Sequence, residues 1–68
     1  MSKEYAFFLY LLERYAAHNN ETADKTLARL IQCDLYDYAI AMYDLYHTEA
    51  IENAFDDLNR KIAARCAK

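Results

Sequence analysis

The sequence contains no glycine and no proline, the residues on which the turns of β-rich folds rely most. Their absence argues against a β-sandwich or barrel and excludes collagen-like and linker-type composition. It also excludes the glycine-rich loops that cradle phosphates. Because 56% of the 68 residues are hydrophobic, the chain is too apolar for a disordered tail. We therefore expect a single all-α domain over residues 1–68.

Cysteine and serine are scarce as well. Cys33 and Cys66 can form at most one disulfide, which is no disulfide framework, so we predict a reduced, cytoplasmic protein. The only serine, Ser2, precedes a helical pattern and is a candidate N-cap, not a nucleophile. His18, His47 and the two cysteines lack the spacing of zinc ligands. We predict no enzymatic activity, no metal and no cofactor.

Long apolar runs are also missing. The longest, from Tyr5 to Leu12, is far shorter than the ~20 residues that span a bilayer, so we expect no membrane segment. No small-residue cleavage pattern of a signal peptide follows this run. We interpret it as part of a buried helix.

Lysine and arginine are absent from residues 34–57, a stretch that holds seven of the eleven acidic residues. The net charge of the chain is −3. Two short helices joined by a tight turn would also suit a helix-turn-helix regulator, which is our alternative function. An acidic second helix would be repelled by DNA phosphates, however, so the charge disfavours nucleic acid as a partner.

Apolar residues at three- and four-residue spacing predict the first two helices. The first runs from Lys3 to His18 and ends at Asn19-Asn20, because asparagine tolerates the left-handed conformation of a helix C-terminus. The second runs from Ala23 to Cys33 with Thr22 as its N-cap. The apolar face of the first helix comprises Tyr5, Phe8, Leu9, Leu12, Tyr15 and Ala16, and that of the second comprises Ala23, Leu27, Leu30 and Ile31.

Two further helices complete a predicted four-helix bundle. We expect the third from Leu35 to Tyr46 with Asp34 as its N-cap, then a break at His47-Thr48 with Thr48 capping the fourth. The alternative is three helices, the last one long and kinked over residues 35–66. The phase of the apolar residues favours the break. The fourth helix would bury Ile51, Ala54, Phe55, Leu58 and Ile62 and pair Asp56 with Arg60 and Asp57 with Lys61.

Tyrosine is abundant, with seven in 68 residues. Tyr36, Tyr38, Tyr43 and Tyr46 lie on the predicted third helix, which carries more apolar surface than three short neighbours can easily cover. Tyrosine suits interfaces because it joins an apolar ring to a polar tip, although the same residues could also pad a small core. The predicted partner-binding residues are Tyr36, Tyr43, Tyr46, His47, Glu49 and Glu52.

The segment from Met42 to Asp57 resembles a family of very short bacterial proteins catalogued as a domain of unknown function. Its members share a Leu/Tyr-His-Thr motif followed by an acidic helix, which here is Tyr46-His47-Thr48 and the residues after it. The glycine usual before the family's third helix is replaced by Gln32-Cys33-Asp34. The family's genes often neighbour those of a second family thought to resemble ADP-ribosyltransferase toxins. The resemblance therefore implies an antitoxin-like or accessory partner of a co-encoded protein.

These observations favour a non-enzymatic protein-interaction module. A chain of this size buries little core, and a partner chain is one usual remedy. We expect a homodimer that also binds a co-encoded protein.

Overall fold

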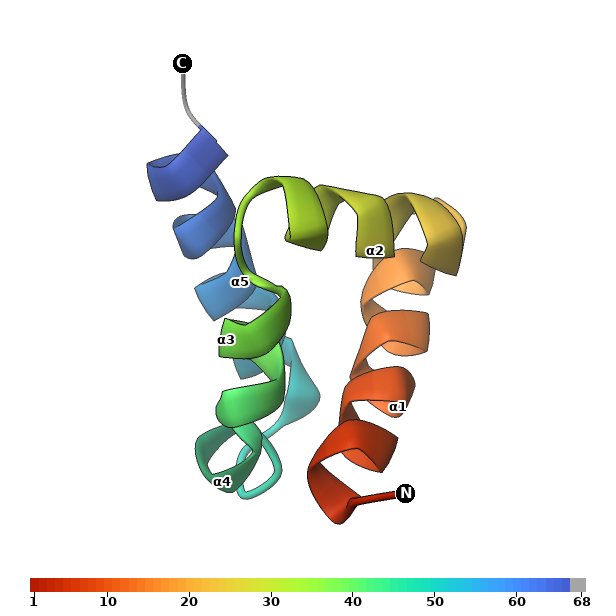
Figure 1. Ribbon diagram of the computed structural model, residues 1–68, viewed down its shortest axis with the longest axis vertical. Coiled ribbons are helices and arrows are strands. Elements are labelled where there is room, and N and C mark those ends of the chain that lie inside the picture. The colour runs from red at the N-terminus through yellow and green to blue at the C-terminus, as the bar shows by residue number, and fades with distance from the viewer. Residues whose placement is uncertain (67–68) are drawn as a thin grey trace.

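The computed structural model describes residues 1–66, which fold into five helices and no strand. In Figure 1, α1 stands upright on the right, α2 crosses the top, and α3 and α4 return downwards in front of α5. The all-α prediction is confirmed. Within residues 1–66 no helix is long and apolar enough to cross a bilayer. The bounds are α1 Lys3–His18, α2 Ala23–Gln32, α3 Tyr36–Ala41, α4 Tyr43–Tyr46 and α5 Ile51–Cys66.

The first two helices begin where the sequence predicts. The hydroxyl of Ser2 accepts a hydrogen bond from the Tyr5 amide at 3.1 Å, and that of Thr22 accepts one from the Lys25 amide at 3.2 Å. Each bond satisfies one of the amides that a helix N-terminus leaves without a partner.

Helix α1 ends in a left-handed turn at Asn20, whose φ is 60°. The Asn20 amide donates to the Ala17 carbonyl at 3.1 Å, and the Glu21 amide donates to the Ala16 carbonyl at 3.0 Å. This pair of bonds defines a Schellman motif, in which glycine normally occupies the left-handed position. Asparagine takes that place here, as the sequence predicts.

Helix α2 ends in a second Schellman motif, centred on Asp34, which also has a φ of 60°. The Asp34 amide donates to the Ile31 carbonyl at 3.1 Å, and the Leu35 amide donates to the Leu30 carbonyl at 2.7 Å. The prediction that Asp34 caps the third helix is wrong, because Leu35 is the N-cap of α3 and makes no side-chain capping bond. Asp34 closes the preceding helix instead, and α2 itself ends at Gln32, one residue earlier than predicted.

The predicted third helix is divided at Met42, whose φ and ψ of −80° and 10° interrupt the helical geometry. Methionine is a good helix former, so local propensity does not predict this break. The turn after it packs Tyr43 against Phe7 of α1, with ring centroids 5.7 Å apart, and buries Tyr46. Tertiary packing thus overrides helix propensity at this position, and the chain has five helices where the sequence predicts four.

The break before α5 is confirmed, which makes the three-helix alternative wrong: α4 ends at Tyr46, and α5 begins at Ile51. Thr48, however, does not cap α5. Its hydroxyl donates to the Leu45 carbonyl at 2.9 Å and so bonds backwards to the end of α4. The two helices are separated by four residues, too many for Thr48 to stand at the N-cap of α5.

The core lies between α1, α2, α3, the end of α4 and the inner face of α5. The predicted α5 face is confirmed, with Ala54, Phe55 and Leu58 buried and Ile51 and Ile62 partly buried. Two predictions for the other helices are wrong, since Leu9 and Ile31 are 36% and 58% exposed. The buried cluster comprises Phe8, Leu11, Leu12, Tyr15, Leu30, Cys33, Leu35, Ala39, Tyr46, Ala54, Phe55 and Leu58.

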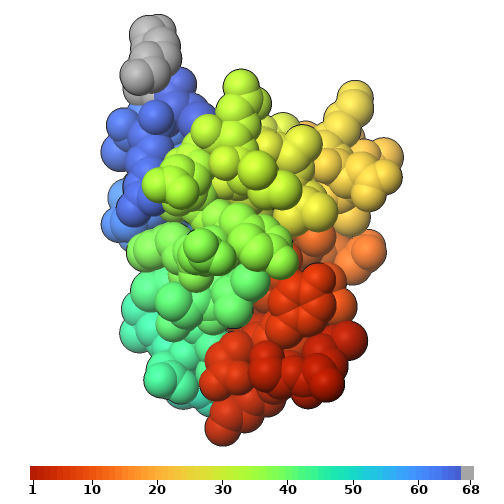
Figure 2. Space-filling view, in the orientation of Figure 1, coloured from red at the N-terminus to blue at the C-terminus, as the bar shows by residue number. Residues whose placement is uncertain are grey.

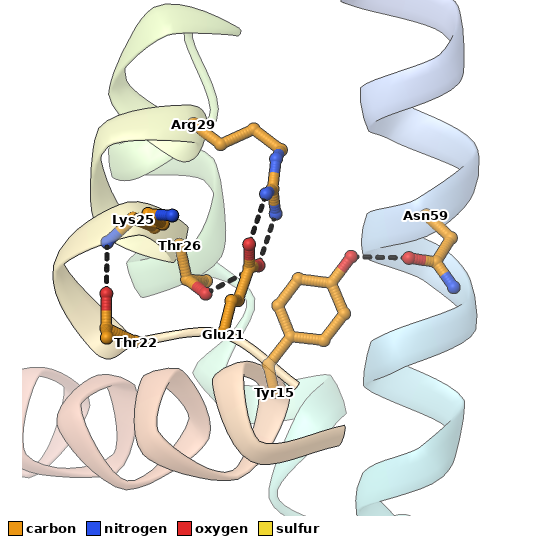
Figure 3. Close-up of polar contacts among 7 residues, drawn as sticks. All are labelled: Tyr15, Glu21, Thr22, Lys25, Thr26, Arg29 and Asn59. Atoms are coloured by element: carbon orange, nitrogen blue, oxygen red, sulfur yellow. Dashed lines mark hydrogen bonds and ion pairs between the residues drawn. The ribbon is translucent and has the colours of Figure 1, made fainter. Parts of the chain in front are cut away.

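A polar network fixes the turn between α1 and α2 (Figure 3). Glu21 accepts hydrogen bonds from the Arg29 guanidinium through both carboxylate oxygens and from the Thr26 hydroxyl at 2.8 Å. The Arg29 bonds, with the Thr26 bond second, lower the pKa of Glu21 to about 2. Beside them, the Tyr15 hydroxyl donates to the Asn59 side chain, which ties α1 to α5.

A disulfide joins Cys33, the C-cap of α2, to Cys66, the last residue of α5. Their Cα atoms are 5.4 Å apart, within the usual range for a disulfide. The expectation of reduced cysteines is therefore corrected: the two residues are distant in sequence, and the fold brings them together. Arg65 reinforces the junction by donating to the Asp34 backbone carbonyl at 2.6 Å.

Candidate functional site

A surface groove of about 310 Å³ lies between the end of α4 and the outer face of α5. Its position follows from the break after Tyr46, which folds the two helices back on each other and leaves a trough beside the turn. The lining residues are Leu45, Tyr46, Glu49, Asn53, Asp56, Asp57 and Arg60.

Asp57 anchors the floor of the groove. One carboxylate oxygen accepts hydrogen bonds from the hydroxyls of Tyr38 at 2.7 Å and Tyr46 at 2.6 Å. The other oxygen lies 3.3 Å from Arg60 and 3.7 Å from Lys61. Burial alone would raise the pKa of Asp57, but the two tyrosine hydroxyls and the two cations together lower it. Asp57 is thus held as an anion in a fixed position.

The same contacts fix the tyrosines. Burial, followed by the hydrogen bond to the Asp57 carboxylate, raises the pKa of both Tyr38 and Tyr46. Tyr46 is only 2% exposed. These hydroxyls therefore serve as structural donors that connect α3 and α4 to α5.

The rim of the groove differs from its floor. Leu45 is 50% exposed, although it is a large apolar side chain. Glu49, Asn53 and Asp56 are exposed as well. The lining thus combines one accessible apolar residue with three carboxylates, counting Asp57, and a single guanidinium from Arg60. Such a surface suits a ligand that carries both apolar and basic groups.

Two of the six predicted partner-binding residues, Tyr46 and Glu49, line this groove. Tyr46 reaches it only from the buried side. Tyr36 packs edge-on against Phe8 at 5.4 Å between centroids and is partly buried. Glu52 is exposed on α5 but does not belong to the lining.

The remaining two, Tyr43 and His47, stack on each other with ring centroids 4.1 Å apart and 3° between their planes. The Lys3 ammonium lies 5.8 Å from the Tyr43 ring. Figure 2 shows this end of the molecule, where the start of α1 and the α4 segment lie side by side. The predicted set therefore does not form one site: it divides between the groove, the packing of Tyr36 against the core, the contact between α1 and α4, and the exposed surface of α5 at Glu52.

Five groove residues were not among the predicted partner-binding residues: Leu45, Asn53, Asp56, Asp57 and Arg60. The acidic residues were visible as a charge block, but an exposed leucine within an apolar helix carries no signal in one sequence. The predicted pair of Asp56 with Arg60 is wrong, because Arg60 turns to Asp57 instead. The predicted pair of Asp57 with Lys61 is confirmed.

Nothing in residues 1–66 assembles a metal centre, since no three His, Cys, Asp or Glu side chains converge there. The two histidines lie apart: His18 packs against Phe55 with ring centroids 4.8 Å apart, and His47 against Tyr43. The groove is an open trough whose polar groups are suited to binding charged groups.

The comparison with protein families identifies the family of this chain. The model of DUF3791, a family of proteins of unknown function, matches residues 6–65. The chain belongs to DUF3791. The match includes every groove residue and all of α2, α3 and α4, so the candidate site lies wholly within the DUF3791 region. No curated protein and no solved structure matches the chain. Membership confirms the expected kind of family, and it assigns no activity to the groove.

Proposed function

We propose that this protein is a non-enzymatic interaction module that binds a segment of another protein in the groove between α4 and α5. The observation that carries the proposal is the exposure of Leu45 beside Glu49 and Asp56. An apolar side chain surrounded by carboxylates offers a partner an apolar anchor and a charge pattern to match.

The rigid floor of the groove supports this function. Asp57 holds Tyr38 and Tyr46 through short hydrogen bonds, so the walls of the groove are set before a partner arrives. Binding to a preformed surface costs less conformational entropy than binding to one that must be ordered first. The groove can therefore contribute affinity despite its small size.

The charge of the groove favours a basic partner segment. Three carboxylates face one guanidinium in the lining, which leaves it acidic. Two copies of the same face would bring acidic surfaces together, so this groove is unsuited to a symmetric dimer. The homodimer that the sequence predicts stays a prediction, and it would have to use another face, such as the exposed apolar side chains of Leu9, Tyr10 and Ile31.

The partner that we propose is a co-encoded protein, with this chain in an antitoxin-like or accessory role in the cytoplasm. The support for this role is the resemblance in the Tyr46-His47-Thr48 motif, which directly adjoins the groove. The alternative role as a DNA-binding regulator has less support, because α3 is only six residues long and carries no lysine or arginine.

The test is a binding measurement between this chain and the purified product of the neighbouring gene. We expect a complex whose affinity falls at least tenfold for Leu45→Ala, about 1.4 kcal/mol, because the apolar anchor is removed. Glu49→Lys should also weaken binding, and the loss of affinity should be larger at low salt than at high salt, because salt screens charges. Calorimetry at two salt concentrations measures both effects.

The matched control is Ile31→Ala, which removes an equally exposed apolar side chain outside the groove. Binding should be unchanged in this variant. Equal losses for both alanine variants, or a complex that tolerates Leu45→Ala, would show that the groove is not the binding site. If the neighbouring product does not bind at all, the antitoxin-like role is wrong.

A further inference from the structure

A second groove, of about 300 Å³, opens beside the disulfide at the junction of α2 and α5. It is lined by Arg29, Gln32, Cys33, Ile62, Arg65 and Cys66, so both cysteines face a surface depression. A disulfide enclosed in a core is reached by thiols only after the protein unfolds, whereas one that lines a groove is open to attack from the folded state.

The two cysteines differ in accessibility. Cys33 is 3% exposed and belongs to the core cluster. Cys66 is partly exposed and is the last residue of α5, and helix ends fray. Ala63 and Ala64, three and two residues before it, are exposed. The contacts between the last turn of α5 and the rest of the fold are therefore made by Ile62, Arg65 and Cys66.

We propose that the Cys33–Cys66 disulfide is a site of thiol–disulfide exchange, in which an external thiol attacks Cys66 from this groove. The thiolate forms a bond with Sγ of Cys66 as the bond between the two cysteines breaks. Cys33 leaves as a thiolate and takes a proton from water. Cys33 then remains buried opposite the mixed disulfide. Once it returns this proton to water, its thiolate can attack Sγ of Cys66, which expels the external group as a thiolate and restores the original bond.

The groove is suited to this chemistry because its cations favour thiolates. Arg29 and Arg65 both line it, and a neighbouring cation stabilises a thiolate, whether attacking or departing. Glu21 pairs with Arg29, and the exposed Asp34 carboxylate lies 3.9 Å from Arg65, so the positive field is moderate. Accessibility therefore determines which sulfur is attacked, and it selects Cys66.

The first test uses the native, oxidised chain and reduced glutathione as the probe. After a short incubation and acid quenching, peptide mass spectrometry locates the glutathione. We expect at least five times more glutathione on Cys66 than on Cys33. Equal labelling, or an excess on Cys33, would overturn the proposal.

The second test separates attack on the folded protein from attack after unfolding. The rate of disulfide reduction by dithiothreitol is measured from zero urea to just below the unfolding transition. We expect a rate that changes less than twofold at low urea, because fraying of one helical turn exposes little surface. If the reduction rate rises with urea from zero concentration as steeply as global unfolding does, the proposal is wrong.

The single-cysteine variants provide the matched comparison. The thiol of Cys66 in Cys33→Ser should react with an aromatic disulfide reagent at least ten times faster than the thiol of Cys33 in Cys66→Ser. Similar rates in two folded variants would contradict the asymmetry. If either variant is unfolded, the two experiments on the native chain still decide the question.

Discussion

The two ends of the molecule are held together by different means. At one end, a covalent bond joins Cys33 to Cys66, and Arg65 donates to the Asp34 carbonyl. At the groove end, α4 and α5 are connected by a short exposed turn and by tyrosine hydroxyls that share the Asp57 carboxylate. The cross-linked end thus gains stability from a covalent bond beside a groove that holds two arginines, whereas the other end depends on hydrogen bonds to Asp57 beside an acidic groove.

Removal of the cross-link should have the largest effect. The double variant Cys33→Ser, Cys66→Ser frees a loop with a sequence separation of 33 residues. We therefore expect the free energy of unfolding of this variant to be lower than that of the parent by about 3.5 kcal/mol. A domain of this size has only about 3 to 10 kcal/mol in total. Urea unfolding followed by circular dichroism measures the loss. A change below about 1 kcal/mol would remove the distinction between the two ends.

At the groove end, Tyr46→Phe should have a smaller effect. It deletes one of two hydroxyl donors to a carboxylate, and such bonds contribute about 1.5 kcal/mol or more. Tyr10→Phe is the control, because that hydroxyl is at the surface, where it accepts a bond from Arg14. The free energy of unfolding of this control, measured in urea, should lie within about 0.5 kcal/mol of that of the parent protein. Equal costs would mean that Asp57 does not organise the groove end.

Acid should destabilise the half of the molecule that holds the disulfide, because it protonates Glu21. Its pKa falls from an ordinary 4.5 to about 2 in the folded protein, so the unfolded chain binds a proton first as the pH drops. The stabilisation is complete above pH 4.5 and is lost as the pH falls towards 2. Urea titrations across this window should show a weaker pH dependence for Glu21→Gln than for the parent. Glu13→Gln, at an exposed position on α1 outside this hydrogen-bond network, is the comparison variant.

The smallest effect concerns the junction beside the disulfide. Asp34→Gly should stabilise the protein by about 0.5 kcal/mol, because glycine adopts the left-handed conformation without a steric cost. It also removes a carboxylate from the negative end of α2. Asn20→Gly should increase the stability less than Asp34→Gly does, because asparagine tolerates this conformation and carries no charge. Thermal melts compare the two, and a loss of stability in Asp34→Gly would show that its 3.9 Å contact with Arg65 matters more.

Much of the fold is predictable from local chemistry. The N-caps at Ser2 and Thr22, the left-handed end at Asn20 and the buried face of α5 all follow from residue type and period. The predictions that are wrong depend on tertiary contacts. Asp is favoured both at N-caps and in left-handed turns, so Asp34 could not be assigned from its identity alone.

The candidate site was less predictable than the fold. The abundance of tyrosine is visible in the sequence, but one sequence does not show that Tyr46 donates to Asp57 from inside the core. The groove depends on where α4 stops and how α5 folds back. The pairing of Cys33 with Cys66 likewise required the fold, because nothing in a separation of 33 residues indicates that they meet.

The cross-link has a consequence for the chain that it encloses. It turns the segment from Cys33 to Cys66 into a covalent ring, and the exposed turn at residues 47–50 lies within that ring. A protease that cuts once in this turn opens the ring without releasing either piece. The nicked protein would migrate as one species without reductant and as two fragments with it.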